Sequence, residues 1–403
     1  MKVTFFPSVS RGTVAAPPSK SIAHRALICG ALSAQSTVHG LSGSDDERAT
    51  RRALQTLGAS VVGAGDTVQI GGLNPRALPG VTLDCGESGS TLRFLLPLCL
   101  CGDVPITLTG RPRLMERPLT VYRTLCEENG LMFRQTETGV SVCGPLKSGH
   151  FSVPGDVSSQ FISGLLFALP MLERESTLEI TGRIESLPYI GLTVQTLAQF
   201  GVAVNRAGQI FTVAPQRVQS RTVTVEGDYS NAAFLDAFRL FGGTGAVTNL
   251  NPSSIQGDRI YKLYFDSLQK TGAVLDLADC PDLAPVLLAV AAAKHGGTFL
   301  HTARLRLKES DRGACMRTEL LKFGVPIKVD ADSITVPDVP LHAPDAILLS
   351  HNDHRIAMAL SVLCAHTGGT LRGAEAVTKS FPDFFDRIRT LGIDFRISDE
   401  KTG

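Results

Sequence analysis

The sequence lacks several features that would assign it to a special class of protein. No window approaches the roughly 18 uninterrupted apolar residues of a membrane span, and residues 1–6 read as a strand, not as a charged-then-apolar leader. None of the nine cysteines forms a C-x-x-C pair, the spacing typical of structural zinc. Cys99 and Cys101 lie in an apolar run, which favours a core position. We therefore expect a cytoplasmic protein with no membrane segment, no disulfides and no metal.

An excess of charge of either sign is also missing. The chain has 39 Lys and Arg against 38 Asp and Glu, a formal net charge of +1. This balance argues against a generally basic face, so we expect no nucleic-acid partner. The basic residues that cluster locally stand beside Ser, Gly and acidic residues, which suits small anions better than a long polyanion.

What the sequence does contain is an internal repeat that runs through all 403 residues. An aliphatic or small residue is followed four positions later by a glycine and then, in most copies, by a strand-like run such as 59–62 or 202–204. This pattern is typical of a helix that ends in a glycine cap before a strand. The six glycines are Gly58, Gly130, Gly201, Gly272, Gly324 and Gly392.

Six units of this size contain both strands and helices, so they predict α/β modules grouped into globular domains. A chain of this length exceeds the size at which a single core stops growing, which predicts two domains. Three units per domain is the natural division. It places one boundary near Glu226, after which 227–231 opens another helix.

Residues 17–25 predict an anion site at the start of a helix. Pro17 and Pro18 stiffen the entry, and the helix begins at Lys20 or Ser21. Its first turn offers free N–H groups, Lys20 adds an ammonium, and Arg25 lies on the same face as Ser21. The alternative is an ordinary capped helix with solvated charges.

Other expected helix starts carry similar polar or basic clusters, for which capping hydroxyls and solvated charges are again the plain alternative. These clusters are 86–93, 111–118, 158–160, 308–312 and 379–385. A metal site is a further reading of 351–355, where His351, Asp353 and His354 are possible ligands. No second cluster of ligands accompanies them, and Arg355 is a poor neighbour for a cation.

Taken together, these motifs resemble, in order and over essentially the whole chain, the 5-enolpyruvylshikimate-3-phosphate synthase family. They are 18–21 with Arg25, 86–93, 116–118, 158–160, 308–312, 352–355 and 379–382. The resemblance implies an α/β fold of two domains with three units each: 1–13 plus 227–403 as a discontinuous domain, and 14–226 inserted into it. It implies an active site in the cleft between the domains.

The resemblance also implies a reaction. It would join phosphoenolpyruvate to the 5-hydroxyl of shikimate 3-phosphate, with release of phosphate and without a metal or organic cofactor. We expect a monomer. Glyphosate would compete with phosphoenolpyruvate. The substrates together bring several negative charges, so several cations must converge on them.

Roles carry over from the family by position. Lys20, Asp282 and Glu309 resemble the catalytic residues. The shikimate 3-phosphate site would comprise Lys20, Ser21, Arg25, Ser158, Ser159, Gln160, Ser186, Tyr189, Asp282 and Lys308. The phosphoenolpyruvate site would comprise Lys20, Gly89, Arg117, Gln160, Arg312, His354, Arg355 and Lys379. Glu87 and Arg304 depart from the family pattern, where Asn is common, and receive no role.

Two rival functions stay open. A related enolpyruvyl transferase acts on UDP-N-acetylglucosamine, but its loop contains a reactive cysteine, and residues 110–117 have none. A catalytically silent anion-binding protein is the second. The carboxylates Asp282 and Glu309 argue against it, because binding alone has no need of acid and base groups placed among cations.

Overall fold

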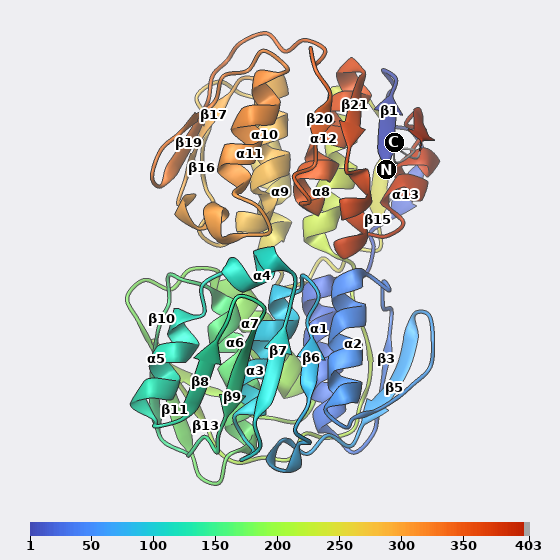
Figure 1. Ribbon diagram of the computed structural model, residues 1–403. Helices are drawn as coiled ribbons and strands as arrows, with labels where there is room; N and C mark the ends of the chain where they lie inside the picture. The colour runs from blue at the N-terminus through green and yellow to red at the C-terminus, as the bar shows by residue number, and fades with distance from the viewer. Residues whose placement is uncertain (399–403) are drawn as a thin grey trace. The chain divides into compact units, whose positions relative to one another are not determined.

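The computed structural model describes residues 1–398, which divide into two compact units (Figure 1). Unit 1 contains Met1–Ser19 and the chain from Gly227 onward, and unit 2 contains Lys20–Glu226. The first crossing follows Ser19 rather than residue 13. The reason is that β2 (Thr13–Ala15) pairs in parallel with β15 (Ala246–Thr248) and so belongs to unit 1.

Unit 2 alternates strands and helices. Its strands are β3 (Ser36–His39), β4 (Ser60–Val62), β5 (Thr67–Gly71), β6 (Thr82–Asp84), β7 (Ile106–Thr109), β8 (Met132–Gln135), β9 (Gly139–Cys143), β10 (His150–Pro154), β11 (Ser176–Thr181), β12 (Asn205–Ala207), β13 (Ile210–Val213) and β14 (Thr222–Thr224). Its helices are α1 (Lys20–Leu32), α2 (Asp45–Thr56), α3 (Gly89–Cys99), α4 (Pro112–Glu116), α5 (Thr120–Glu128), α6 (Ser159–Ala168) and α7 (Leu187–Gln199), with 3-10 turns η1 (Pro75–Ala77) and η2 (Leu169–Met171). The strand expected at 202–204 begins slightly later, as β12.

Unit 1 is built from the same kinds of element. Besides β2 and β15, its strands are β1 (Lys2–Phe5), β16 (Val274–Asp276), β17 (Gly297–Leu300), β18 (Lys328–Val329), β19 (Ser333–Val336), β20 (Leu348–Leu349), β21 (Gly369–Arg372) and β22 (Phe395–Ser398). Its helices are α8 (Tyr229–Ala237), α9 (Tyr261–Leu268), α10 (Ala284–Ala293), α11 (Arg312–Leu321), α12 (His354–Thr367) and α13 (Phe384–Thr390), with 3-10 turns η3 (Phe238–Phe241), η4 (Gly257–Ile260), η5 (Pro281–Leu283), η6 (Ala303–Leu307) and η7 (Ala374–Lys379).

One sheet topology recurs in both units. In the order β6-β7-β9-β8, the first two strands are parallel and the others antiparallel to their neighbours. The same arrangement is found in β10-β11-β13-β12, β14-β3-β5-β4, β16-β17-β19-β18 and β20-β21-β1-β22. The strands β14 and β1 complete sheets that begin elsewhere in the chain. The remaining sheet in the described chain pairs β15 with β2 alone, and together the sheets confirm the six predicted α/β units.

The six predicted cap glycines all adopt positive φ, from 63° at Gly130 to 107° at Gly58. Glycine pays no Cβ penalty in this region, which explains its recurrence after each helix. Gly272 differs from the others because the next strand, β16, starts a new sheet, whereas the strand after each of the other five glycines is the edge strand of its own unit's four-stranded sheet. The unit that contains Gly272 therefore has the two-stranded sheet.

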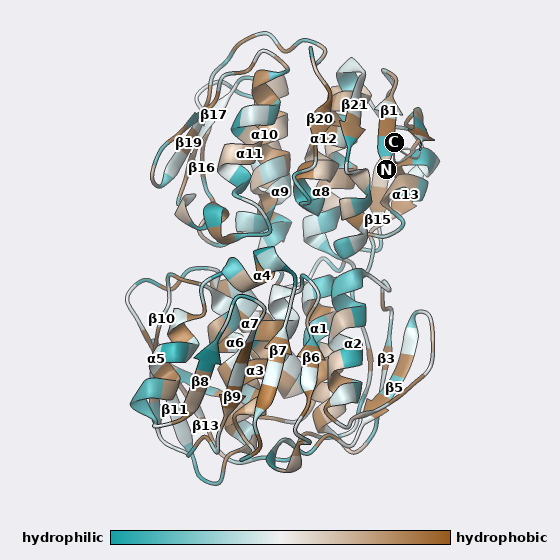
Figure 2. Cartoon of the chain, in the orientation of Figure 1, coloured by the Kyte–Doolittle hydropathy of each residue, from teal (hydrophilic) through white to brown (hydrophobic). Residues whose placement is uncertain are grey.

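Each unit encloses its own hydrophobic core. Figure 1 shows the helices in the middle of each unit with the sheets around them, and Figure 2 shows apolar residues concentrated on those helices. Helix α10 is apolar on all sides, and Cys99 and Cys101 are buried as predicted. Helix α1 carries its charged side chains, Lys20 and Arg25, in its first two turns. Within residues 1–398, no helix is both long and apolar enough to cross a membrane.

Candidate active site

The first residue of α1, Lys20, forms a largely buried ion pair. Its Nζ lies 2.8 Å from Oδ2 of Asp46 in the first turn of α2. The side chains are 13% and 11% exposed, so water screens the pair only in part. Asp46 therefore orients the ammonium that the sequence predicted to bind anions.

One turn further along α1, Arg25 is buried among neutral oxygen atoms. Its Nε donates to Thr193 Oγ1 at 2.8 Å, and its Nη atoms donate to the carbonyls of Ser21 at 2.6 Å and Tyr189 at 2.9 Å. Nη2 also reaches Ser163 Oγ at 3.4 Å. Burial lowers the pKa of Arg25 to about 10. The guanidinium is thus held in place by acceptors that do not balance its charge.

Gly89 opens α3 and lets two arginines approach the backbone. A Cβ at this position would lie 2.6 Å from Arg117 Nη1 and 3.1 Å from Arg93 Nη1. Arg93 donates to Gln160 Oε1 at 2.8 Å, and the Gln160 amide donates to Ser90 Oγ at 3.1 Å. The N-terminal ends of α3 and α6 are therefore joined by polar contacts.

A directed chain of hydrogen bonds supports the start of α3. Thr91 donates its hydroxyl to Ser88 Oγ at 2.7 Å, so Thr50 must donate to Thr91 across 2.6 Å. His24 Nδ1 then donates to Thr50 Oγ1 at 2.7 Å. Burial, with help from nearby cations, keeps the pKa of His24 well below its usual value. A neutral histidine thus anchors the cap residue Ser88.

In unit 1, Arg312, the first residue of α11, forms ion pairs with three carboxylates. Arg312 is 1% exposed, and its Nε lies 2.9 Å from Asp353 Oδ2. Nη1 lies 2.9 Å from Asp282 Oδ1, and Nη2 lies 2.7 Å from Glu309 Oε2. Burial opposes the charged form, but the three carboxylates raise the pKa of Arg312 above its usual value.

Asp282 is shared by further cations. Lys308 Nζ lies 3.2 Å from Oδ1, and Arg355 Nη2 lies 3.0 Å from Oδ2. Burial lowers the pKa of Lys308, an effect that Asp282 partly offsets. Asp282, Glu309 and Asp353 are therefore fixed by a continuous network of ion pairs.

Lys379 and the segment before α12 complete this network. Lys379 Nζ donates to the carbonyl of Asn352 at 2.5 Å. Asp353 caps α12 by accepting from Arg355 N at 2.9 Å. The three possible metal ligands do not share one site, because His351 forms an ion pair with Glu319. Within residues 1–398, no group of three or more His, Cys, Asp or Glu is arranged to hold a metal.

Comparisons with known proteins identify the family and the fold. The family model for EPSP synthase (3-phosphoshikimate 1-carboxyvinyltransferase) matches residues 7–388. This chain belongs to the EPSP synthase family. It is 37% identical to the 3-phosphoshikimate 1-carboxyvinyltransferase of Clostridium kluyveri over 97% of each chain, and 38% identical to that of Clostridium acetobutylicum over 96% of each. A solved EPSP synthase from Acinetobacter baumannii matches the fold with a TM-score of 0.80 at 23% identity, covering 99% of this chain and 100% of that one.

The structure brings most of the family-derived site residues into two clusters, one per unit. Several of these residues instead contact their neighbours through the backbone or stand at the start of a helix. Ser21 and Tyr189 contact Arg25 through their carbonyls, and Ser158 caps α6 by accepting from Gln160 N. Ser159 is the first residue of α6, and Ser186, with φ of 57°, precedes α7. His354 Nδ1 lies 3.9 Å from Asp353 Oδ1.

Sequence reasoning did not assign a role to Asp46, Arg93 or Asp353. Arg93 was visible as a cation inside an expected helix start. Asp46 belongs to the acidic run 45–47, which reads as a complement to the helix dipole. Asp353 was weighed only as a metal ligand. Their contacts come from other elements, so no local pattern could reveal them.

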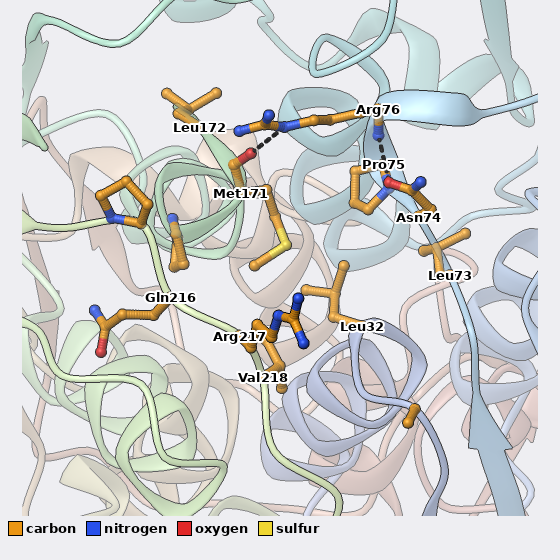
Figure 3. Close-up of a pocket in the computed structure, with 13 residues that line it drawn as sticks. Leu32, Leu73, Asn74, Pro75, Arg76, Met171, Leu172, Gln216, Arg217 and Val218 are labelled. Carbon is orange, nitrogen blue, oxygen red and sulfur yellow. Dashed lines mark hydrogen bonds between the residues drawn. The ribbon is translucent and has the colours of Figure 1, made fainter. Parts of the chain in front are cut away.

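A cavity of about 700 Å³ in unit 2 is distinct from these clusters (Figure 3). Leu32, the last residue of α1, lines it together with Arg76 and Met171, and Arg76 Nε donates to the Met171 carbonyl at 2.8 Å. Lys20 stands at the opposite end of α1. The cavity therefore lies a helix length away from the polar cluster.

Proposed function

We propose that this chain transfers the enolpyruvyl group of phosphoenolpyruvate to the 5-hydroxyl of shikimate 3-phosphate and releases phosphate. This is the activity for which its family is named, in the shikimate pathway of aromatic amino acid biosynthesis. The observation that carries the proposal is the Arg312 cluster, because it fixes Asp282 and Glu309, two carboxylates suited to proton transfer, on one buried cation.

We assign the binding of shikimate 3-phosphate mainly to unit 2. Arg25 supports this assignment, because an anion would supply the charge that its neutral acceptors lack. The start of α6 adds the hydroxyls of Ser158 and Ser159 at a helix N-terminus, a favourable environment for phosphate. The full set is Lys20, Ser21, Arg25, Ser158, Ser159, Gln160, Ser186, Tyr189, Asp282 and Lys308.

Phosphoenolpyruvate carries a carboxylate and a phosphate, so its site needs several cations. We assign it to Lys20, Gly89, Arg117, Gln160, Arg312, His354, Arg355 and Lys379. Arg312 has a second task in this proposal. Its guanidinium already donates to Asp282 and Glu309, so it orients the proton-transfer groups while offsetting substrate charge.

The chemistry is an addition followed by an elimination. Glu309 gives a proton to the methylene carbon while the 5-hydroxyl attacks the adjacent carbon, and Asp282 or Lys20 takes the hydroxyl proton. A carboxylate beside that carbon stabilises its cationic character. The new methyl group then returns a proton, the double bond re-forms, and the bond to phosphate breaks. One C–O bond forms and one breaks, with no net oxidation and no need for a metal or organic cofactor.

We further infer a cytoplasmic monomer. Each unit encloses its own core, and the free cysteines suit a reducing compartment. Light scattering coupled to gel filtration tests the monomer. A mass near 42.9 kDa supports it, and twice that mass contradicts it.

Phosphate release is the direct test of the activity. Purified protein is incubated with phosphoenolpyruvate and either shikimate 3-phosphate or UDP-N-acetylglucosamine. We expect release only with shikimate 3-phosphate. Release with the nucleotide sugar alone would assign the chain to the related reaction, and binding of both substrates without release would indicate a silent binding protein.

A further inference from the structure

Two consecutive residues immediately before α12 have a left-handed backbone. His351 has φ of 52° and Asn352 has φ of 55°. The other positive-φ residues besides glycine in residues 1–398 occur singly. Such conformations are unfavourable for residues with a Cβ and persist only where the surroundings hold them.

The side chain of His351 provides that hold. Its Nε2 lies 2.8 Å from Oε1 of Glu319, a fully buried carboxylate on α11. Glu319 is itself fixed by Lys322 Nζ at 2.8 Å and by the backbone N–H of Leu349 at 3.0 Å. Cys315 and Glu319 raise the pKa of His351 to about 9. The ring is therefore a charged donor clamped to a rigid acceptor.

The residues next to His351 supply hydrogen-bond acceptors to two cations of unit 1. The carbonyl of Asn352 accepts from Lys379 Nζ. The carboxylate of Asp353 accepts from Arg312 Nε at 2.9 Å and from the Ser310 hydroxyl at 3.0 Å. A change in the backbone at 351–352 would move acceptors that both cations use.

We propose that His351 is a positioning residue whose contact with Glu319 holds the 351–352 backbone so that Lys379 and Arg312 keep the geometry required for phosphoenolpyruvate. It does not touch substrate. The proposal rests on the proposed function for the identity of the substrate, but the clamp itself can be tested without turnover.

Substitutions of His351 distinguish the loss of its contact with Glu319 from a general loss of folding. His351→Gln keeps an N–H donor near Nε2, whereas His351→Leu has a similar size without a donor. His351→Asn is too short to reach Glu319 but tolerates the left-handed backbone, so it covers the case in which His351→Leu does not fold. His342→Leu is the matched control, because His342 is an exposed histidine of the same unit.

The first readout is phosphate release with phosphoenolpyruvate varied at saturating shikimate 3-phosphate. For His351→Leu and His351→Asn we expect KM for phosphoenolpyruvate to rise about 5- to 20-fold with kcat within about 3-fold of the parent. We expect His351→Gln and His342→Leu to stay within about 2-fold in both constants. A merely structural role would lower the active fraction without this split or the rescue by Gln.

The second readout is hydrogen exchange of the Asp353 amide, which donates to the Ser350 carbonyl at 3.0 Å. It should accelerate in His351→Leu and His351→Asn and not in His351→Gln. Parental KM together with parental exchange in both donor-free variants would overturn the proposal, as would a failure of Gln to rescue. If the parent protein releases no phosphate, the proposed function fails, and the exchange result alone decides whether the clamp exists.

Discussion

Two arginines, one in each unit, are almost equally buried but have opposite surroundings. Arg25 is 2% exposed and donates to hydroxyl and carbonyl oxygens, whereas Arg312 is 1% exposed and donates to three carboxylates. Burial lowers the pKa of Arg25, while the carboxylates raise that of Arg312 in spite of burial. Burial alone therefore does not tell what a cation is for.

The hydrogen-bond partners of the two arginines distinguish their roles. A buried cation with neutral acceptors carries charge that an incoming anion can balance, which suits the binding of shikimate 3-phosphate. A buried cation with three carboxylates already donates to them before substrate binds, so its rigid fork mainly fixes the groups around it. We infer that Arg25 serves substrate binding and that Arg312 serves the placement of Asp282 and Glu309.

The largest effect should come from removing each guanidinium in turn. We expect Arg312→Met to lose about 3–5 kcal/mol of unfolding free energy, because three carboxylates, of which Asp353 is fully buried, then lose the cation they share. Arg25→Met should lose only about 1–2 kcal/mol, since it leaves neutral acceptors unsatisfied. Unfolding curves of the two variants in guanidinium chloride measure this difference in unfolding free energy. Equal losses would show that the two sites are not distinct in the way their partners indicate.

The next effect concerns the acid and base groups that Arg312 holds. Glu309→Gln should lower kcat by about 100-fold or more with little change in KM, because the amide can hydrogen-bond but cannot exchange the proton. Lys379→Ala, a matched change in unit 1, should instead raise KM for phosphoenolpyruvate. Steady-state phosphate release measures both. Near-parental kcat in folded Glu309→Gln would move the proton-transfer role to Asp282 or Lys20.

In unit 2, a smaller effect should result from crowding the arginines beside Gly89. A methyl group there meets the ends of Arg117 and Arg93, which must move by a few tenths of an ångström or more. We expect Gly89→Ala to raise KM for phosphoenolpyruvate about 10-fold with a smaller change in kcat. Gly149→Ala, where nothing lies within 4 Å of the new Cβ, is the control. Identical kinetics in both variants would separate Gly89 from substrate binding.

The smallest effect concerns the ion pair of His351 and Glu319. The folded-state pKa of His351 is raised to about 9 from 6.5, so its stabilisation is complete below pH 6.5 and is lost as pH rises through 9. We expect His351→Gln to be about 1–2 kcal/mol less stable than the parent at pH 6 and nearly equal at pH 10. Using the difference between the two proteins cancels the contributions of groups that do not interact with His351. A difference that does not change with pH would argue against a charged His351.

Much of the fold could be predicted because its signals are local. The cap glycines, such as Gly58 and Gly130, mark helix ends through backbone conformation alone, and all six have the expected positive φ. The two-stranded sheet of the unit that contains Gly272 could not be predicted, since it depends on the pairing of β15 with β2, which lie far apart in the chain.

The candidate site could be predicted less well from the sequence, because its contacts join residues that lie far apart in the chain. The pair of Glu309 and Arg312 is separated by three positions and lies within one motif, but Asp282 and Asp353 approach Arg312 from distant parts of the chain. The family resemblance supplied the residues, yet it could not supply their partners. The contrast between Arg25 and Arg312 therefore emerged only from the three-dimensional arrangement.

The most direct test of this division of roles is the affinity for shikimate 3-phosphate measured by calorimetry without phosphoenolpyruvate, so that no turnover occurs. The contrast between the two arginines predicts that Arg25→Met, in unit 2, weakens binding by about 10-fold or more, whereas Glu309→Gln, in unit 1, leaves it within about 2-fold of the parent. Parental affinity in folded Arg25→Met, or an equal loss in Glu309→Gln, would contradict it.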